Sequence, residues 1–539
     1  MSDTTMRDTA FGASEAVKPN LDQKSHVSAI LVFILLLVSG VGYAAYGIIT
    51  DTNSVGEPLA LSALVLLGVA LMIALGFEFV NGFHDTANAV ATVIYTHSLP
   101  PIFAVVWSGF FNFLGVVVST GAVAYGIITL LPVELILQVG SSGGYAMIFA
   151  LLIAAITWNL GTWALGIPNS SSHALIGSIM GVGIANQLMA PPNQATSGVE
   201  WSQAIKVGEA LLFSPLCGFI LAGLLLILMK VIVPVAALYR EPRGTTPWWI
   251  RGILILTCTG VSFAHGGNDG QKGMGLIMLI LIGVAPTAYA LNRTMPESST
   301  PAFVETLRRA ETVFAARAKG APSINPAEAR RRIGEALKTR DVDRPDTYAS
   351  LASVSEEIAN GVLIYGSIRH VPAAATPNMR NDMYLVSDAI RLLSEKGVMF
   401  DQEQTANLKA YRQALNEGTR FIPTWVKVSV AIALGLGTMV GWKRIVVTVG
   451  ERIGKQHLTY AQGASAEIVA AGTILGAEYY GLPVSTTHIL SSGVAGTMAA
   501  NGSGLQRGTV RAIVLAWVLT LPAAMAIAGC LYFIFRQML

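Results

Sequence analysis

Two short polar segments of nearly the same pattern interrupt long apolar stretches of this chain: PNSSSH at residues 168–173 and PVSTTH at residues 483–488. Proline lacks an amide donor and disfavours helix in the residue before it, so we expect each proline to end the preceding helix. The serines and threonines that follow are good helix N-caps. A helix start carries about half a positive charge together with free amides and hydroxyls. Each segment is therefore suited to an anion.

A second pair of polar motifs lies upstream: NGFHDTAN at residues 81–88 and HGGNDGQK at residues 265–272. When their glycines are aligned, Asp85 falls on Asp269, and we expect each aspartate to follow a glycine-containing break and to begin a helix. A carboxylate in apolar membrane surroundings costs about 2.5 to 3.5 kcal/mol on insertion scales, so such residues are functional by default. Helix capping is the simpler alternative, but it does not explain two matched copies.

The residues that follow the two aspartates differ in charge. Asn88 lies three positions after Asp85, and Lys272 lies three positions after Asp269, so each pair shares a helix face. An anion beside two carboxylates is repelled unless cations accompany it. The Lys272 ammonium could replace a mobile sodium ion, leaving protons or a metal bound to the anion to balance the remaining charge. An Asp269–Lys272 ion pair that only neutralises itself is the alternative, and the two interpretations are compatible.

Several further titratable or polar residues lie in or near these motifs. The candidates for coupling or gating are Glu78, His84, His173, His265, Asn268 and His488. Histidine titrates near neutral pH and can carry a proton, but His173 and His488 directly follow the expected caps, where a structural hydrogen bond is the favoured role. Glu78 is preferred among the glutamates because it lies close to Asp85. Glu467 and Glu478 are eleven residues apart, about three helical turns, so they can face the same side.

Composition defines the protein class. Of the 539 residues, 53% are hydrophobic and only 12% are charged, and the mean hydropathy is +0.57, as in a polytopic membrane protein. Charge is unevenly placed, since 18 of the 35 lysines and arginines lie between Arg293 and Arg420. The sequence therefore predicts a polar tail (1–27), a first membrane region (28–292), a soluble helical insert (293–421) and a second membrane region (422–539). The positive charge of the insert favours the cytoplasm.

Helix lengths and spacings indicate a repeat. The apolar segments after the two polar breaks, residues 174–189 and 489–500, are too short to cross a bilayer, which needs roughly 20 residues, so we expect re-entrant hairpins. The separation of Asp85 from Ser170 is 85 positions and that of Asp269 from Ser485 is 216; the difference, 131, is close to the 129 residues of the insert. Two copies ending in an interrupted helix are typical of a transporter with its site at the repeat interface.

At these residues the sequence resembles the inorganic phosphate transporter family of the Pit type, and within it the bacterial low-affinity branch. The motifs NGFHDTANA (81–89) and HGGNDGQKG (265–273), with the two hairpin segments, carry the resemblance and are together highly specific. It implies an all-α polytopic membrane protein with two inverted repeats, broken helices and re-entrant helical hairpins, plus an inserted soluble helical domain. The implied substrate-binding residues are Asp85, Asn88, Ser170, Ser171, Asp269, Gln271, Ser485 and Thr486; the positive charge of Lys272 adds this residue to the set. Asp85 and Asp269 would also be the ligands of a transported metal ion.

The resemblance also bears on coupling. Sodium-coupled members usually read NDVANA in both halves, whereas this chain has Gly270, Gln271 and Lys272 in the second. The departure disfavours sodium and agrees with the bacterial branch, which is understood to symport protons with phosphate, often as a neutral metal phosphate. The expected partners are inorganic phosphate, protons, divalent cations such as magnesium and the lipid bilayer, with no nucleic acid and no cofactor. A homo-oligomer is compatible with the sequence, and the expected location is the bacterial inner membrane, with multiple spans.

Three alternatives remain open. Sodium-coupled phosphate symport is one, and transport of another oxyanion such as sulfate is a second. Phosphate near pH 7 can donate a hydrogen bond to a carboxylate, whereas sulfate cannot, so the two aspartates favour phosphate. A membrane hydrolase using the serines and histidines is the third, but the whole motif is repeated and there is no G-x-S-x-G elbow, so we expect no enzymatic activity.

Overall fold

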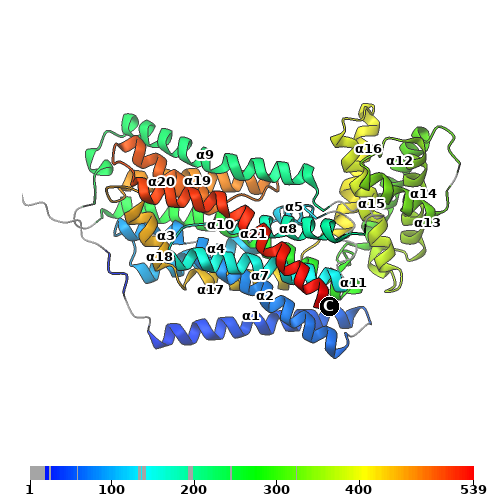
Figure 1. Ribbon diagram of the computed structural model, residues 1–539, viewed down its shortest axis with the longest axis horizontal. Helices are drawn as coiled ribbons and strands as arrows, with labels where there is room; N and C mark the ends of the chain where they lie inside the picture. Colours follow the sequence, from blue (N-terminus) through cyan, green and yellow to red (C-terminus); the bar gives the residue numbers. More distant parts are fainter. Residues whose placement is uncertain are drawn as a thin grey trace, which may run out of the picture.

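The computed structural model describes residues 19–22, 26–56, 59–85, 87–131, 135, 141–191, 198–242, 246–322 and 324–538, except the side chains of Asp85, Ala87 and Ser142. These residues form helices and one isolated bridge between Gly454 and Leu505. An elongated bundle of apolar helices carries a group of shorter helices at one end (Figure 1). The helices of the apolar part are α1 (Val27–Ser54), α2 (Leu61–Asp85), α3 (Ala87–Tyr95), α4 (Pro101–Val118), α5 (Ala122–Ile128), α7 (Ser142–Ala164), α8 (Ser171–Met189), α9 (Trp201–Ile232), α10 (Trp248–Val284), α11 (Pro286–Tyr289), α17 (Thr424–Thr438), α18 (Lys443–Val447), α19 (Tyr460–Tyr479), α20 (Thr486–Asn501) and α21 (Arg507–Met538).

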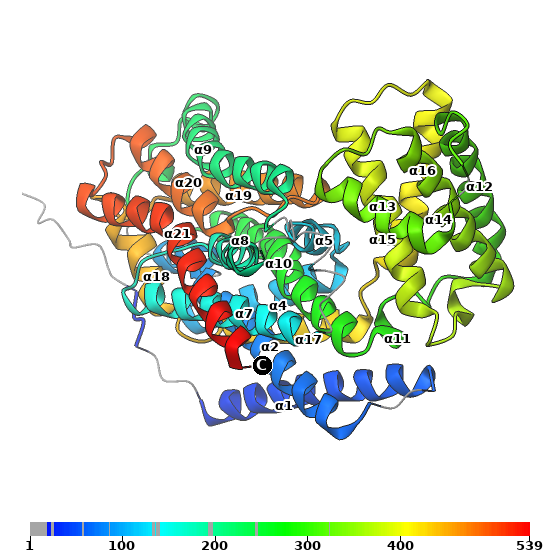
Figure 2. The ribbon, with the colours of Figure 1, turned by 45° about the vertical axis from the view of Figure 1, so that its right-hand side comes forward.

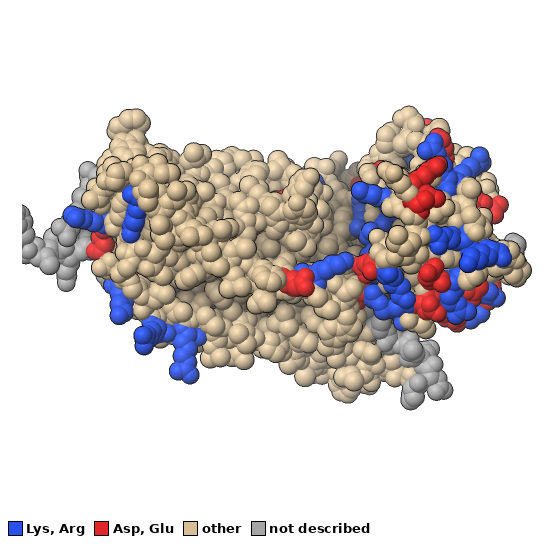
Figure 3. Space-filling model, turned by 90° about the horizontal axis from the view of Figure 1, so that it is seen from above, with Lys and Arg blue, Asp and Glu red and all other residues tan. Residues whose placement is uncertain are grey.

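Six helical segments of the described chain are long and apolar enough to cross a membrane: α1, α2 together with α3, α4, α7, α9 and α21. Large apolar side chains on α1, α9 and α21 point outward, including Leu35, Phe213 and Val518. Burial in lipid explains such outward-facing residues, because lipid tails are as apolar as the side chains. In the view of Figure 3 the middle of this part is almost free of charged residues; a few lie at its left end, and many gather at the right end of the molecule.

The two polar segments form hairpins, α7 with α8 and α19 with α20, and both hairpins turn in the same way. Gly166 and Gly481 each have φ = +67°, a left-handed conformation that suits glycine. The next amides fold back, Ile167 N donating to Thr162 O at 3.1 Å and Leu482 N to Ala477 O at 2.9 Å. The outgoing helices end four residues before the prolines, so these glycine turns end them and the expectation that proline does so was wrong.

Helix α10 corrects a second expectation. It runs unbroken for 37 residues, from Trp248 to Val284, so no break precedes Asp269. Its glycines instead allow close packing: a Cβ on Gly266 would lie 2.1 Å from the Asn112 carbonyl oxygen of α4, and one on Gly273 would lie 2.3 Å from Glu78 Cγ of α2. In the first half α2 ends at Asp85 and α3 begins at Ala87; Thr86 lies outside the described residues.

Matching contacts link the two halves. Helix α2 packs on α17 as α10 packs on α4, and α9 packs on α20 as α21 packs on α8. Where α2 meets α17, a Cβ on Gly82 would lie 2.2 Å from Leu434 O. Where α10 meets α4, a Cβ on Gly266 would lie 2.1 Å from Asn112 O. Gly82 and Gly266 are the residues aligned in the sequence repeat. The packing supports the repeat, and its inversion stays a prediction.

The helices at the far end have an apolar core of their own. They pack mainly on one another and enclose Leu307, Phe314, Leu351, Met383 and Tyr411 (Figures 1 and 2). They are α12 (Thr300–Arg317), α13 (Pro326–Lys338), α14 (Pro345–Ile364), α15 (Thr376–Glu395) and α16 (Gln402–Thr419). We call this bundle the insert. Helix α16 meets α17 at an angle of 74°, where the chain returns to the apolar part.

Candidate substrate site

The middle of α10 is a polar face inside the apolar bundle. Asp269 and Lys272 are fully buried, and His265 is 3% exposed. Lys272 Nζ donates to Asp269 Oδ1 at 2.7 Å, and His265 Nε2 lies 3.1 Å from Asp269 Oδ2. A buried charge is stable only when it is paired. The ion pair between Asp269 and Lys272, one of the two compatible interpretations of their i,i+3 spacing, is present in the structure.

The second hairpin reaches the same carboxylate. Thr486 Oγ1, the first residue of α20, donates to Asp269 Oδ2 at 3.2 Å. Asn268 supports the loop before it, since its Nδ2 donates to Leu482 O at 3.2 Å. Asn88 on α3 donates to Thr487 Oγ1 at 3.3 Å, so one residue of the first half also meets this hairpin. Four of the residues expected at the site, Asn88, Asn268, Asp269 and Thr486, therefore lie near the second hairpin. The side chain of Asp85 is not among those that the structure describes.

The two hairpin tips meet beside α10. Ser172 Oγ donates to Val484 O at 2.7 Å, and the rings of His173 and His488 lie with their centroids 4.6 Å apart. His488 also stacks on Trp517 at 4.0 Å, which fits a structural role. The helix starts of α8 and α20 are therefore neighbours, and their partial positive charges act on the same small volume.

The predicted capping is confirmed in both hairpins. Ser170 Oγ accepts from His173 N at 3.2 Å, and Ser485 Oγ accepts from His488 N at 3.1 Å. Each cap engages only the oxygen as an acceptor, so the hydroxyl hydrogen can still be donated to an anion. Ser171 is fully buried in the first turn of α8. Ser170 and Ser485 therefore keep a hydroxyl hydrogen to donate where the helix starts converge, whereas Thr486 donates its own to Asp269.

The side chain of Gln271 forms its hydrogen bonds with α5, α10 and α19, not with the hairpin tips. Its Nε2 donates to Gly267 O at 2.7 Å and to Glu478 Oε1 at 3.0 Å, and its Oε1 accepts from Val123 N of α5 at 2.8 Å. Residues two apart on a helix do not face each other, so Gln271 points away from Asp269. Gln271 connects α10 to α5 and α19.

The three glutamates of the apolar segments and His84 each have a polar partner within the bundle. Glu78 Oε2 accepts from Asn81 Nδ2 at 3.3 Å, and His84 Nε2 lies 3.3 Å from Thr162 Oγ1. Glu467 Oε2 accepts from Thr257 Oγ1 of α10 at 2.5 Å. Because Glu478 also contacts α10 through Gln271, the two glutamates of α19 face the same side, as their spacing predicts.

Two further residues of the network were not expected from the sequence. Asn112 Oδ1 of α4 lies 2.8 Å from His265 Nδ1, and its Nδ2 donates to Thr438 Oγ1 of α17 at 3.3 Å. Asn112 is the one amide side chain on the largely apolar α4. A lone amide in an apolar helix indicates a buried polar contact, and this was the feature of the sequence that could have identified Asn112. Nothing in the sequence tells which distant helix such a residue will meet.

Among the described residues, no three His, Cys, Asp or Glu side chains are placed to hold a metal ion together. The two oxygens of Asp269 are contacted by Lys272, His265 and Thr486. The role of Asp85 and Asp269 as ligands of a transported metal stays a prediction.

Known proteins are similar in sequence to most of this chain. The sequence profile described as "Phosphate transporter family" matches residues 81–528. The low-affinity inorganic phosphate transporters PitA and PitB of Escherichia coli K12 are 40% and 39% identical over 498 and 495 residues, each covering 88% of this chain and 97% of the relative. A probable low-affinity inorganic phosphate transporter of Bacillus subtilis is 28% identical over 475 residues, covering 88% of this chain and 98% of its own.

One solved structure shares the fold. It is described as "The sodium-dependent phosphate transporter", has a TM-score of 0.50 and 20% sequence identity, and covers 88% of this chain and 100% of its own. Such low identity supports the fold and no finer property. The profile match and the bacterial relatives establish that the chain belongs to the phosphate transporter family.

Proposed function

We propose that this chain is a multi-pass protein of the bacterial inner membrane that carries inorganic phosphate by symport with protons, the phosphate travelling with a divalent metal as a neutral complex. Membership of the family supports phosphate as the solute and transport as the activity. The observation that carries the choice of coupling ion is the fully buried pair of Lys272 Nζ and Asp269 Oδ1, 2.7 Å apart.

A tethered ammonium changes what the site needs from solution. With Lys272 in contact, the charge of Asp269 is balanced before any ion enters, so a sodium ion at this carboxylate would add an unpaired positive charge. The phosphate dianion then brings the uncompensated charge. Protons or a bound divalent metal can neutralise it, and a neutral complex crosses the apolar interior at the lowest electrostatic cost.

Phosphate is held by the converging hairpin tips. The hydroxyls of Ser170, Ser171 and Ser485 and the free amides of α8 and α20 donate to its oxygens. Thr486 Oγ1, which donates to Asp269 Oδ2 in this structure, donates to phosphate in exchange for that bond. The carboxylate of Asp269, with Asp85 in the other half, accepts from a protonated phosphate oxygen. This preference for an anion that can donate favours phosphate over sulfate.

The proton path begins at the groups nearest the pair. His265 lies 3.1 Å from Asp269, so a change of charge on one is felt by the other. Glu78 is fully buried and packs against Gly273, the residue after Lys272. We assign His265 and Glu78 as the first candidates for carrying the coupled proton and His84 as a further candidate. Asn268, His173 and His488 hold or gate the hairpins.

The test is uptake by site variants. Asp269→Asn removes the charge on which Lys272, His265 and Thr486 converge; because a hydrogen bond to a charged group is worth about 1.5–3 kcal/mol, uptake should fall about tenfold or more. The control is Glu305→Gln, which removes an exposed ion pair on α12 and should leave uptake unchanged. Membrane insertion is measured for both by quantifying the protein in membranes. Wild-type uptake by Asp269→Asn would refute the site.

A further inference from the structure

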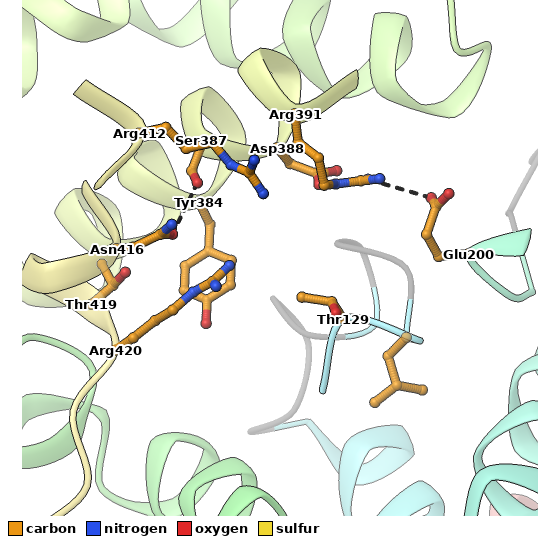
Figure 4. A pocket seen from close by; sticks show the side chains of 11 residues that line it. Thr129, Glu200, Tyr384, Ser387, Asp388, Arg391, Arg412, Asn416, Thr419 and Arg420 are labelled. Atoms are coloured by element: carbon orange, nitrogen blue, oxygen red, sulfur yellow. Dashed lines mark hydrogen bonds and ion pairs between the residues drawn. The ribbon is translucent and has the colours of Figure 1, made fainter. Parts of the chain in front are cut away.

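A pocket lined with arginines separates the insert from the apolar part. It lies between α15 and α16 on one side and Thr129, Leu131 and Glu200 on the other (Figure 4). Its cavity measures about 30 Å³ and is partly open to solvent. None of its residues takes part in the candidate substrate site.

One of its three arginines is already paired. Arg391 Nε lies 2.6 Å from Asp388 Oδ1, and Arg391 Nη1 and Nη2 lie 3.1 Å from Glu395 Oε1 and 3.7 Å from Glu200 Oε2. These contacts also engage the two carboxylates of the lining, Asp388 and Glu200. The guanidinium group of Arg391 is therefore occupied by carboxylates of the protein.

Arg412 and Arg420 have no ion-pair partner in the part of the chain that the structure describes. Arg412 Nε is buried without a hydrogen-bond partner. Burial, Arg420 and Arg391 hold the pKa of Arg412 below its usual value, because its charge is both desolvated and repelled. Arg420 lies over the ring of Tyr125, 5.5 Å from the centroid. Figure 4 shows both guanidinium groups reaching toward the middle of the pocket.

A neutral donor completes the lining. Ser387 Oγ donates to Asn416 Oδ1 at 3.1 Å, which fixes the amide and leaves its NH₂ group as a donor. Two guanidinium groups and an amide are the donor set that recognises a phosphoryl anion, since arginine binds two oxygens at once. A divalent metal would find no free carboxylate here, because both are paired with Arg391.

The short helix α5 joins this pocket to the substrate site. At its start Val123 N donates to Gln271 Oε1, two residues from Asp269. In its middle Tyr125 donates to Phe421 O at 2.7 Å, and after its end Thr129 lines the pocket. An anion bound by Arg420 competes with the contact of this arginine with Tyr125, so the occupant acts on a helix bound to α10.

We propose that this pocket is a second binding site for inorganic phosphate, formed by Arg412, Arg420 and Asn416, through which phosphate on the insert's side of the membrane regulates transport. The proposal rests on phosphate being the transported solute and is independent of the coupling ion. Within the described residues neither guanidinium group forms an ion pair, so the two together match one phosphate dianion.

The test is binding of radiolabelled inorganic phosphate to the purified full-length chain by equilibrium dialysis in a neutral detergent, which excludes lipid headgroups as the bound species. The double variant Arg412→Gln/Arg420→Gln should bind one phosphate fewer per chain than wild type. Arg412→Lys/Arg420→Lys, which keeps the charge, should retain the site with weaker affinity and so shows that loss is not misfolding. Arg309→Gln, on an exposed pair of the insert, is the matched control and should bind as wild type.

The outcomes separate this site from the substrate site. If Asp269→Asn loses one phosphate and the pocket variant loses another, both sites stand. Unchanged binding by Arg412→Gln/Arg420→Gln overturns the pocket site and leaves the substrate site intact. A regulatory role further requires that raising phosphate on the insert's side changes the uptake rate of wild-type proteoliposomes and not that of the pocket variant; an equal response of both contradicts it.

Discussion

At the scale of single residues, the substrate site is a small group of buried charges that depend on one another. Asp269 is contacted by Lys272 at 2.7 Å, His265 at 3.1 Å and Thr486 at 3.2 Å, all inside the bundle. Removing one member of such a group leaves the others uncompensated. Stability and function therefore have to be separated by combined substitutions.

Lys272→Met leaves Asp269 without its counter-charge and should lower the free energy of unfolding by about 3 to 5 kcal/mol, as for other broken buried pairs. Asp269→Asn/Lys272→Met removes both charges and should recover most of that stability without recovering phosphate uptake. Thermal unfolding and uptake are measured on the same preparations. A double variant that transports like wild type would mean that the pair is only structural.

Residue types and spacing predicted much of this site. The Asp269–Lys272 pair followed from i,i+3 geometry, and the caps at Ser170 and Ser485 followed from the residues after each proline. The engagement of Gln271 with α5 and Glu478 did not, because its partners lie 148 and 207 positions away. The hydrogen bond between Asn112 and Thr438 was not predicted either, because these residues lie 326 positions apart.

At the scale of helices, the glycines near the site serve packing more than bending. The pattern around Gly266 and Gly267 suggested a break, yet α10 is continuous and uses Gly266 to admit the backbone of α4. A glycine inside an apolar run is compatible with a break and with a close contact, and only the facing helix decides between them. The two pairs of helices joined by a polar turn were predicted from local signals, the polar residues at each turn, whereas their re-entry into the membrane stays a prediction.

Gly266→Ala should destabilise the protein and impair uptake, because the added Cβ would lie 2.1 Å from the Asn112 carbonyl and must push α4 away from α10. Overpacking of this kind costs about 1 to 3 kcal/mol. Gly260→Ala on the same helix is the control, since its nearest neighbour is Ala471 Cβ at 4.0 Å and alanine favours helix by about 1 kcal/mol. Equal unfolding temperatures for the two variants would contradict this role of Gly266.

At the scale of the whole molecule, matched pairs of helices surround the site and the insert lies at one end (Figures 1 and 2). Each long helix that follows a hairpin packs on the return arm of the other hairpin, α9 on α20 and α21 on α8. A movement of one half therefore has to displace the hairpin of the other. Such an arrangement suits alternating access around the hairpin tips.

The central claim is that Lys272 takes the place of a coupling sodium ion, and the most direct measurement is labelled phosphate uptake by wild-type proteoliposomes under an imposed proton or sodium gradient, each with and without magnesium. The account predicts accumulation driven by the proton gradient, strengthened by magnesium and unaffected by sodium. Accumulation driven by sodium alone would contradict it, since Lys272 would then coexist with a sodium ion at the site.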